Sequence, residues 1–328
     1  MLSSKEGLIL LSGTTSVTAF ASLAIYDAQT LSLTADIAGS FTLEVLKGTL
    51  MAMDERLMAV RPHPDQINTA ANIRAILKDS PMLERYRGHR VQDALSIRCM
   101  PQLHGPVKKA VKDAQATLAI ELNSSVDNPL IFDEEDGGAV ALMGCNADGT
   151  YAGMASDNLC IAITDLCKMS NSRIDRLLNS LVSELPAFLN KNTDFNNGLM
   201  MIQYASAGLQ GELRILAHPA VVDNLTTCAN QEDYVNMGYN AAKKAYDSMH
   251  LAKYILAAEL ICDGQALDCY DDKRCAKGTQ AIYDLLRSKV PEMDNDMPLT
   301  PYLEAVAQQI IHRDYIRTVE ACVGELKY

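Results

Sequence analysis

The stretch that decides the fold runs from Tyr151 to Leu185 and reads YAGMASDNLCIAITDLCKMSNSRIDRLLNSLVSEL. Its apolar residues recur mostly at steps of three and four, the spacing of one face of an α-helix. These residues are Leu159, Ile163, Leu166, Ile174, Leu177 and Leu181. Pro186 follows and ends the pattern, because proline lacks the backbone N–H that a continuing helix needs. The stretch therefore predicts one long helix with a buried face.

Three more segments on both sides of this stretch are predicted to be helices. They are Pro106 to Leu122, Glu232 to Leu267, and Leu33 to Met51. The last of them is apolar on two faces, which suits a helix in the middle of a bundle or at a subunit interface.

Strand patterns are confined to two short runs, Leu130 to Phe132 and Ala139 to Met143. An acidic stretch that ends in glycine separates the two runs, so we expect a small hairpin. Helical patterns fill most of the rest, without β–α–β alternation. The sequence predicts an all-α fold, an elongated bundle of long helices with one short β-hairpin. A polar region near residue 270 is expected to separate this bundle, residues 1–270, from a small C-terminal helical segment, residues 271–328.

The composition argues against several classes of function. The formal net charge of −12 would repel a phosphate backbone, so we expect no nucleic-acid binding. The apolar stretch from Val17 to Tyr26 is too short to cross a bilayer, and the first residues lack the features of a secretory signal. We therefore expect a cytoplasmic protein without a membrane span. The nine cysteines include no C-x-x-C pair and are interpreted as reduced thiols, and no histidine pair has metal-ligand spacing.

Six short strings occur along the chain in the order in which one enzyme family has them. They are Lys5-Glu6-Gly7-Leu8, Arg61-Pro62-His63-Pro64, Val91-Gln92-Asp93 with Ser96 and Arg98, Glu121-Leu122-Asn123 with Asp127-Asn128-Pro129, Ala217-His218-Pro219-Ala220, and Ala229-Asn230-Gln231-Glu232-Asp233. On these strings the chain resembles the later part of the aromatic amino acid lyase family, the histidine and phenylalanine ammonia-lyases. The sequence contains no Ala-Ser-Gly, the tripeptide from which such enzymes build their electrophile.

The resemblance implies a demanding reaction, the elimination of ammonia from an α-amino acid. Removal of the weakly acidic proton on the β-carbon needs an electron sink, a base, and fixed charges that hold the substrate. The family's sink is a methylidene-imidazolone ring, and its base is a tyrosine on a mobile loop. Since the resemblance places both upstream of residue 1, we expect no cofactor within this chain and an electrophile supplied by a partner chain.

Three residues of the shared strings match family residues of the active centre. Arg98 matches the arginine that pairs with the substrate carboxylate, a role that suits a planar and permanently charged fork. The resemblance implies catalytic roles for Gln92, which lines the centre, and for Glu232, a carboxylate near the substrate's amino group or side chain. The simpler interpretations are an ordinary ion pair for Arg98, a surface or cap position for Gln92, and a helix start for Glu232, with Asn230 as its N-cap.

The chain departs from the family at several strings, most of which concern the same site. Ser12 stands where the family has an asparagine that positions the electrophile, and Leu95 stands where it has a tyrosine. The family's Asn-Phe-His-Gly is Asn146-Ala147-Asp148-Gly149 here. We assign Ser12, Leu95, Asn146 and Asp148 to the substrate-binding side of the site. Either the substrate differs from histidine and phenylalanine, or the site has lost its ancestral chemistry.

The leading hypothesis is one subunit of a split ammonia-lyase-like enzyme that acts on a small amino-acid-like substrate. One alternative is a lyase that works without the ring, on a substrate whose proton is already acidic. The other is a non-catalytic scaffold or regulatory subunit. Because family members are tetramers whose active centres draw on several subunits, we expect a homo- or hetero-oligomer.

Overall fold

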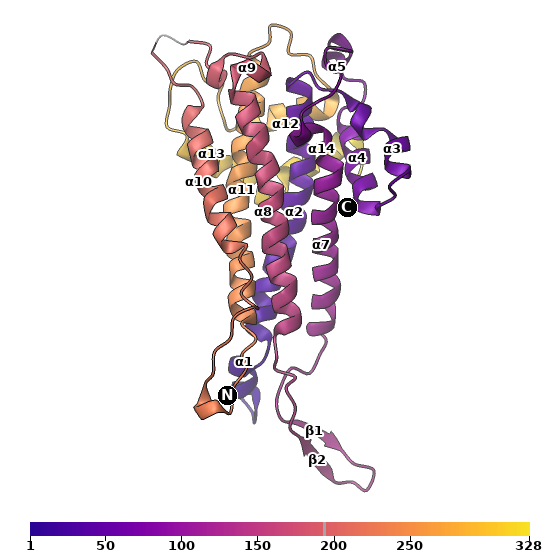
Figure 1. Cartoon of the computed structure of the whole chain (residues 1–328), viewed down its shortest axis with the longest axis vertical. Coiled ribbons are helices and arrows are strands. Elements are labelled where there is room, and N and C mark those ends of the chain that lie inside the picture. Colours follow the sequence, from indigo (N-terminus) through magenta and orange to yellow (C-terminus); the bar gives the residue numbers. More distant parts are fainter. Residues whose placement is uncertain (193–194) are drawn as a thin grey trace. The chain divides into compact units, whose positions relative to one another are not determined.

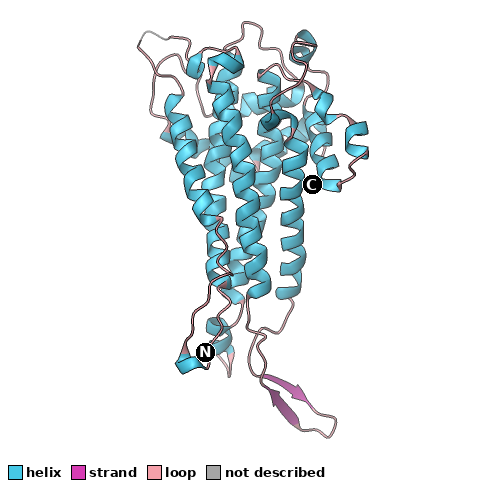
Figure 2. Ribbon diagram, in the orientation of Figure 1, coloured by secondary structure: helices cyan, strands magenta, loops and turns pink. Residues whose placement is uncertain are grey.

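The computed structural model describes residues 1–192 and 195–328, and most of these residues are helical (Figure 1; Figure 2). The predicted all-α class with one short hairpin is confirmed. The α-helices are α1 (Glu6–Ser12), α2 (Thr15–Val45), α3 (Glu55–Ala59), α4 (Pro64–Ile76), α5 (Pro81–Arg85), α6 (Leu95–Arg98), α7 (Met100–Glu121), α8 (Thr150–Leu178), α9 (Ser180–Ser183), α10 (Met200–Leu216), α11 (Gly238–Asp268), α12 (Lys277–Arg287), α13 (Thr300–Ile311) and α14 (Asp314–Val323). Three 3-10 turns are η1 (Leu50–Met53), η2 (Ala187–Leu189) and η3 (Cys228–Asn230), and the strands are β1 (Leu130–Asp133) and β2 (Ala139–Leu142).

The two strands form the predicted antiparallel hairpin, with each strand within one residue of its expected bounds. Leu130 lies opposite Leu142, and Asp133 lies opposite Ala139. Gly137 in the connecting turn has a φ of +81°, a conformation that glycine adopts without steric cost.

Contacts divide the chain into two compact units. Unit 1 holds residues 1–26, 110–161 and 216–248, and unit 2 holds residues 27–109, 162–215 and 249–328. The expected boundary near residue 270 stays a prediction.

In unit 2, helices α2, α7, α8 and α11 lie side by side and are joined by buried polar contacts (Figure 1). Every residue of α2 and its C-terminal turn from 30 to 48 is buried. This burial confirms that the segment predicted to have two apolar faces lies within a bundle.

The long helix α2 begins far earlier than expected and also ends earlier, at Val45 rather than Met51. The hydroxyl groups of Thr18 and Ser22 donate to backbone carbonyls four residues back, 3.1 and 2.7 Å away, so these polar residues do not interrupt the helix. At the other end Lys47 takes the left-handed conformation with a φ of +57°. Its N–H and that of Gly48 bond back to carbonyls of the last turn, which closes the helix.

Three other predicted helix bounds are wrong, and local caps explain two of them. Helix α8 ends at Leu178 rather than Leu185, because the Asn179 side chain accepts a hydrogen bond from the N–H of Leu181 and starts a new turn. Helix α11 begins at Gly238 rather than Glu232, and the Asn236 side chain accepts from the first N–H, 2.8 Å away. Helix α7 begins at Met100 and includes Pro106, so that proline does not mark its start.

Within the part of the chain that the structure describes, no single helix combines the length and apolar character of a membrane span. Only the pair α1 and α2, with a bend of 54° between them, is together long and apolar enough for a membrane span. None of the nine cysteines, all of which lie in described segments, forms a disulfide.

Candidate functional site

The predicted site residues fall in two groups, one in each unit. Unit 2 holds Gln92, Leu95 and Arg98, and unit 1 holds Ser12, Asn146, Asp148 and Glu232. The expectation that Arg98 and Glu232 serve one site stays a prediction.

Arg98, the last residue of α6, is a partly buried guanidinium without the expected structural partner. Its Nε atom is buried and has no hydrogen-bond acceptor among residues 1–192 and 195–328, and no carboxylate in that part of the chain forms an ion pair with Arg98. The ordinary ion pair weighed from the sequence is therefore not present in the described chain. A buried donor without a partner is costly, so this side chain is well suited to an anionic ligand.

Gln92 and Leu95, which precede Arg98, are exposed, and Leu95 has 62% of its surface open to solvent. Between them Asp93 is buried, and its Oδ2 atom accepts from the N–H of Thr49 at 2.8 Å. Burial raises the pKa of the Asp93 carboxyl above its ordinary value. The segment is thus fixed through Asp93 and Thr49, while Gln92 and Leu95 remain open to a ligand.

The other end of this segment is held by a buried network that sequence reasoning missed. The Nη1 atom of Arg173 donates to the Ser96 carbonyl at 3.3 Å. The same guanidinium forms an ion pair with Glu259, and neither side chain has any exposed surface. No pattern along the sequence pointed to this pair, because its members are 86 positions apart.

In unit 1, Asp148 has a structural role that the sequence did not suggest. Its Oδ1 atom accepts from the N–H of Thr150 at 2.8 Å, at the first turn of α8. The hydroxyl of Thr150 lies 2.8 Å from the hydroxyl of Tyr234, so the start of α8 is joined to the segment that carries Glu232. Asn146 is exposed, with its Nδ2 atom 3.4 Å from the Ser125 carbonyl.

Glu232 lies at the base of a tight loop and not at a helix start. Its Oε2 atom accepts from the hydroxyl of Thr227 at 2.6 Å, and the backbones of these two residues form a bridge. Asn230 belongs to η3 and does not cap α11, so the interpretation of Glu232 as a complement to that helix dipole is wrong. The exposed carboxylate has one oxygen that remains open to a cationic group.

Three of the family-like strings are explained by structural contacts within unit 1. Lys5 forms an ion pair with Asp127 at 2.6 Å and donates to the Pro129 carbonyl, and the contact with Lys5 lowers the pKa of Asp127. Asp157 accepts from the N–H of Ala220 at 2.8 Å and lies 2.9 Å from the Lys244 ammonium.

A cavity of about 790 Å³ lies in unit 2 beside the segment that carries Gln92. Its lining includes Lys47, Tyr86 and Arg90, the last of which is two residues before Gln92. Lys47 and Arg90 both contact Glu184, at 3.0 and 3.1 Å, and Lys47 contributes most to lowering the pKa of that carboxyl to about 2. A cavity of this size accepts small organic ligands, although Gln92 and Arg98 are outside its lining.

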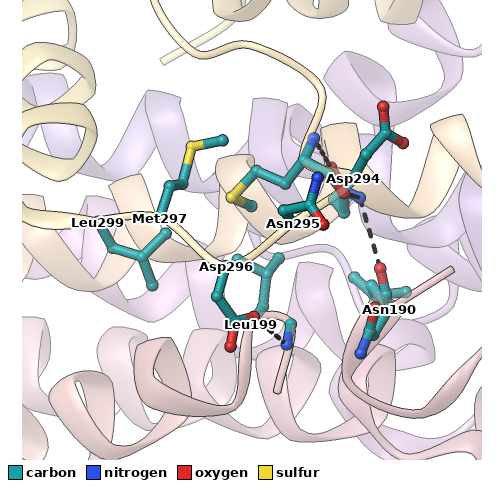
Figure 3. A pocket seen from close by; sticks show the side chains of 11 residues that line it. Asn190, Leu199, Asp294, Asn295, Asp296, Met297 and Leu299 are labelled. Atoms are coloured by element: carbon teal, nitrogen blue, oxygen red, sulfur yellow. Dashed lines mark hydrogen bonds between the residues drawn. The ribbon is translucent and has the colours of Figure 1, made fainter. Parts of the chain in front are cut away.

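A second cavity in unit 2 is too small for a substrate. Figure 3 shows around it the side chains of Asn190, Leu199, Asp294, Asn295, Asp296, Met297 and Leu299. Its volume of about 10 Å³ is that of a single water molecule. Asp296 accepts from the N–H of Gly198 at 2.9 Å, which joins two loops, and Gln265 of α11 donates to the Met293 carbonyl at 2.9 Å, which joins one of these loops to that helix.

The residues present do not fit the family's electrophile. The 328 residues contain no Ala-Ser-Gly, so they cannot form the ring. Ser12, where the family has an amide, donates its hydroxyl hydrogen to the Leu8 carbonyl at 2.8 Å and can then only accept. In the described segments no group of three or more histidine, cysteine or acidic side chains is arranged to hold a metal ion.

Comparisons with known proteins agree with the family resemblance. The sequence profile of the family described as "Aromatic amino acid lyase" matches residues 1–288. "Histidine ammonia-lyase 2" of Fusobacterium nucleatum is 41% identical over 327 residues, 99% of this chain and 64% of that protein. The crystal structure of histidine ammonia-lyase from Trypanosoma cruzi matches with a TM-score of 0.89 and 33% identity over 98% of this chain and 61% of that one. The structure of tyrosine aminomutase from Streptomyces globisporus matches with a TM-score of 0.91 and 28% identity over 99% and 66% of the two chains. The chain thus spans less than two thirds of the length of the histidine ammonia-lyases that it matches.

Proposed function

Because the chain belongs to the aromatic amino acid lyase family, we propose that it is a subunit of an ammonia-lyase-like enzyme, a carbon–nitrogen lyase acting on an α-amino acid. In this proposal the chain binds the substrate, and a partner chain supplies the methylidene-imidazolone electrophile and the base. The 328 residues contain no Ala-Ser-Gly, so in this proposal the electrophile comes from outside them.

The observation that carries the proposal is the guanidinium of Arg98 with a buried, unsatisfied Nε atom. A substrate carboxylate would accept hydrogen bonds from this fork in a fixed plane. Such a contact would fix the direction of the substrate's Cα–Cβ bond, which the removal of a Cβ proton requires. Gln92, exposed six residues earlier, would contribute a further polar contact.

Glu232, from this or another copy of the chain, would take the substrate's amino group. Thr227 occupies one carboxylate oxygen, which leaves the other to accept a hydrogen bond from an ammonium. The elimination breaks the Cβ–H and Cα–N bonds, and it leaves an unsaturated acid and ammonia. The role of Glu232 in this proposal is to hold the leaving nitrogen.

A lyase that works without the ring is the alternative that the departures favour. Ser12 is committed to Leu8, and Leu95 presents an exposed apolar side chain where the family has a phenol. In that case the substrate's own proton would be acidic enough for removal without the ring, and Arg98 would still bind the carboxylate.

An oligomer is also part of the proposal. Helix α10 exposes three large side chains, Met201, Tyr204 and Ile215, by 57%, 66% and 75%. Their spacing along the sequence places all three on one side of the helix. Large apolar side chains gathered on one exposed face are typical of subunit contacts. The residues therefore support assembly with further copies or with the partner chain.

The test is an assay for ammonia release after purification with any chain that co-purifies. L-Histidine, L-tyrosine and L-phenylalanine are supplied, and ammonia and the ultraviolet absorbance of the unsaturated acid are followed. We expect release from at least one of them, with a loss of activity in Arg98→Lys and Glu232→Gln. Arg317→Lys serves as the control, because Arg317 is exposed and pairs with Asp314 only three residues away. Activity that is indifferent to both site substitutions would exclude the proposed site.

A further inference from the structure

The one-turn helix α6 cannot hold its own shape. It has four residues, and its N-cap, Ala94, makes no side-chain cap. Short isolated helices are unstable in water because the first turn fixes several dihedrals for one hydrogen bond. The orientation of Arg98 at its end must therefore come from contacts with other elements.

Two such contacts are present, both in unit 2. Asp93, just before α6, accepts from the N–H of Thr49 at 2.8 Å. Inside α6 the Ser96 carbonyl accepts from Nη1 of Arg173 at 3.3 Å. Arg173 is thus the side chain from α8 that fixes the turn carrying Arg98.

Arg173 is itself held from the opposite side. Its Nε and Nη2 atoms donate to the two oxygens of Glu259, the latter at 3.0 Å. The hydroxyls of Ser170 and Thr42 also donate to Glu259. Because the guanidinium is planar and bound on two edges, it has little freedom to turn away from Ser96.

We propose that Arg173 is a positioning residue, which fixes α6 through the Ser96 carbonyl so that Arg98 presents its guanidinium to the substrate carboxylate. This inference rests on the proposed function for the role of Arg98. The fixing of α6 follows from contacts of Arg173 alone. A lysine at this position would keep the positive charge beside Glu259. It would lose the Nη1 group, which donates to the Ser96 carbonyl.

The test compares Arg173→Lys with wild type in the full chain, by two measurements. The first is the Kd of L-histidine and of histamine, which has the same ring and amino group without the carboxylate. The second is hydrogen exchange of the peptide that covers residues 93–99. We expect the preference for L-histidine over histamine to fall by about tenfold, the effect of weakening one hydrogen bond to a charged group, and exchange in this peptide to rise.

Ser170→Ala is the matched control, since it removes a donor from Glu259 and leaves the contact between Arg173 and Ser96. It is expected to lower thermal stability without changing the preference for L-histidine or exchange at 93–99. Unchanged exchange at 93–99 in Arg173→Lys would overturn the inference, as would a fall in stability with no change in preference. A wild-type protein without preference for L-histidine would instead count against the proposed function, and the exchange result would still decide whether Arg173 holds α6.

Discussion

Two buried carboxyl groups on α11, one turn apart, are expected to respond differently when each is replaced by its amide. The hydroxyl of Thr42 lies 2.9 Å from Oε1 of Glu259 and 2.7 Å from Oδ1 of Asp263. It has one hydrogen, so one of the two groups must donate to it. Burial, followed by the nearby Glu259 charge, raises the pKa of Asp263 well above its ordinary value. Asp263 is therefore the protonated member, and Glu259 is the anion that faces Arg173.

The magnitudes follow from this assignment. Glu259→Gln removes the counter-charge of a guanidinium without exposed surface, and breaking a buried pair in this way costs about 3–5 kcal/mol of unfolding free energy. Asp263→Asn keeps a donor for Thr42 and removes no charge at neutral pH, so its cost at pH 6 is expected to stay below about 1 kcal/mol.

The pH dependence separates the two carboxyl groups further. Because the folded pKa of Asp263 is raised, its contribution to stability is fully present below the unfolded pKa of about 3.9 and is lost as the pH rises toward the folded value. The loss is at most about 1.4 kcal/mol per pH unit for one proton. Asparagine does not titrate at this position, so Asp263→Asn should gain stability relative to wild type between pH 6 and pH 8.

Urea unfolding followed by circular dichroism, at pH 6 and pH 8, checks these expectations. Glu304→Gln is the control, because Glu304 is exposed and its carboxylate accepts from the Tyr254 hydroxyl, at 3.0 and 2.9 Å. Equal losses in Glu259→Gln and Asp263→Asn would refute the assignment of the proton. So would a stability of Asp263→Asn that falls relative to wild type as the pH rises.

Three further predictions concern packing, a loop contact and thiol reactivity. Gly105→Ala should lose about 1–3 kcal/mol of unfolding free energy, because the added Cβ would lie 2.7 Å from a backbone atom of α4. Gly208→Ala is the matched variant, because there is open space around that position. Its unfolding free energy should rise by up to about 1 kcal/mol in the same unfolding assay. Asp157→Asn should speed amide exchange at Ala220 and Val221, whose N–H groups both bond to the Asp157 carboxylate; unchanged exchange there would contradict this role. Ellman's reagent should label exposed thiols in the native protein and reach buried ones only on unfolding, because burial raises the pKa of the thiol and blocks access. The exposed thiols are Cys145, Cys228 and Cys322, and the buried ones are Cys160, Cys167 and Cys262.

The periodicity of apolar residues predicted the interiors of the long helices and the strand pair. It also predicted, within one residue, the start of α8 and the ends of α7 and α11, but not the other helix ends. Those ends depend on local hydrogen bonds, made by the side chains of Asn179 and Asn236 and by the backbone N–H of Lys47. Each such bond competes with a helical one and leaves the apolar pattern unchanged. The bounds of α2, α8 and α11 therefore differ from the expected ones.

The family-like strings located Gln92, Arg98 and Glu232, but not the contacts that hold them. Arg173 and Glu259 are 86 positions apart, and Lys47 and Glu184 are 137 apart. Pairs this distant leave no periodic signal in one sequence. The departures at Ser12 and Asp148 were visible from the sequence, whereas their bonds to Leu8 and Thr150 required the structure.

The central claim is that Arg98 binds the carboxylate of an amino acid. Isothermal titration of L-histidine into the wild-type chain and into Arg98→Lys tests it most directly. Loss of a charge-assisted, bidentate contact corresponds to about 1.5–3 kcal/mol, so Kd should rise by about 10- to 150-fold. A Kd that is the same in both proteins would contradict the claim.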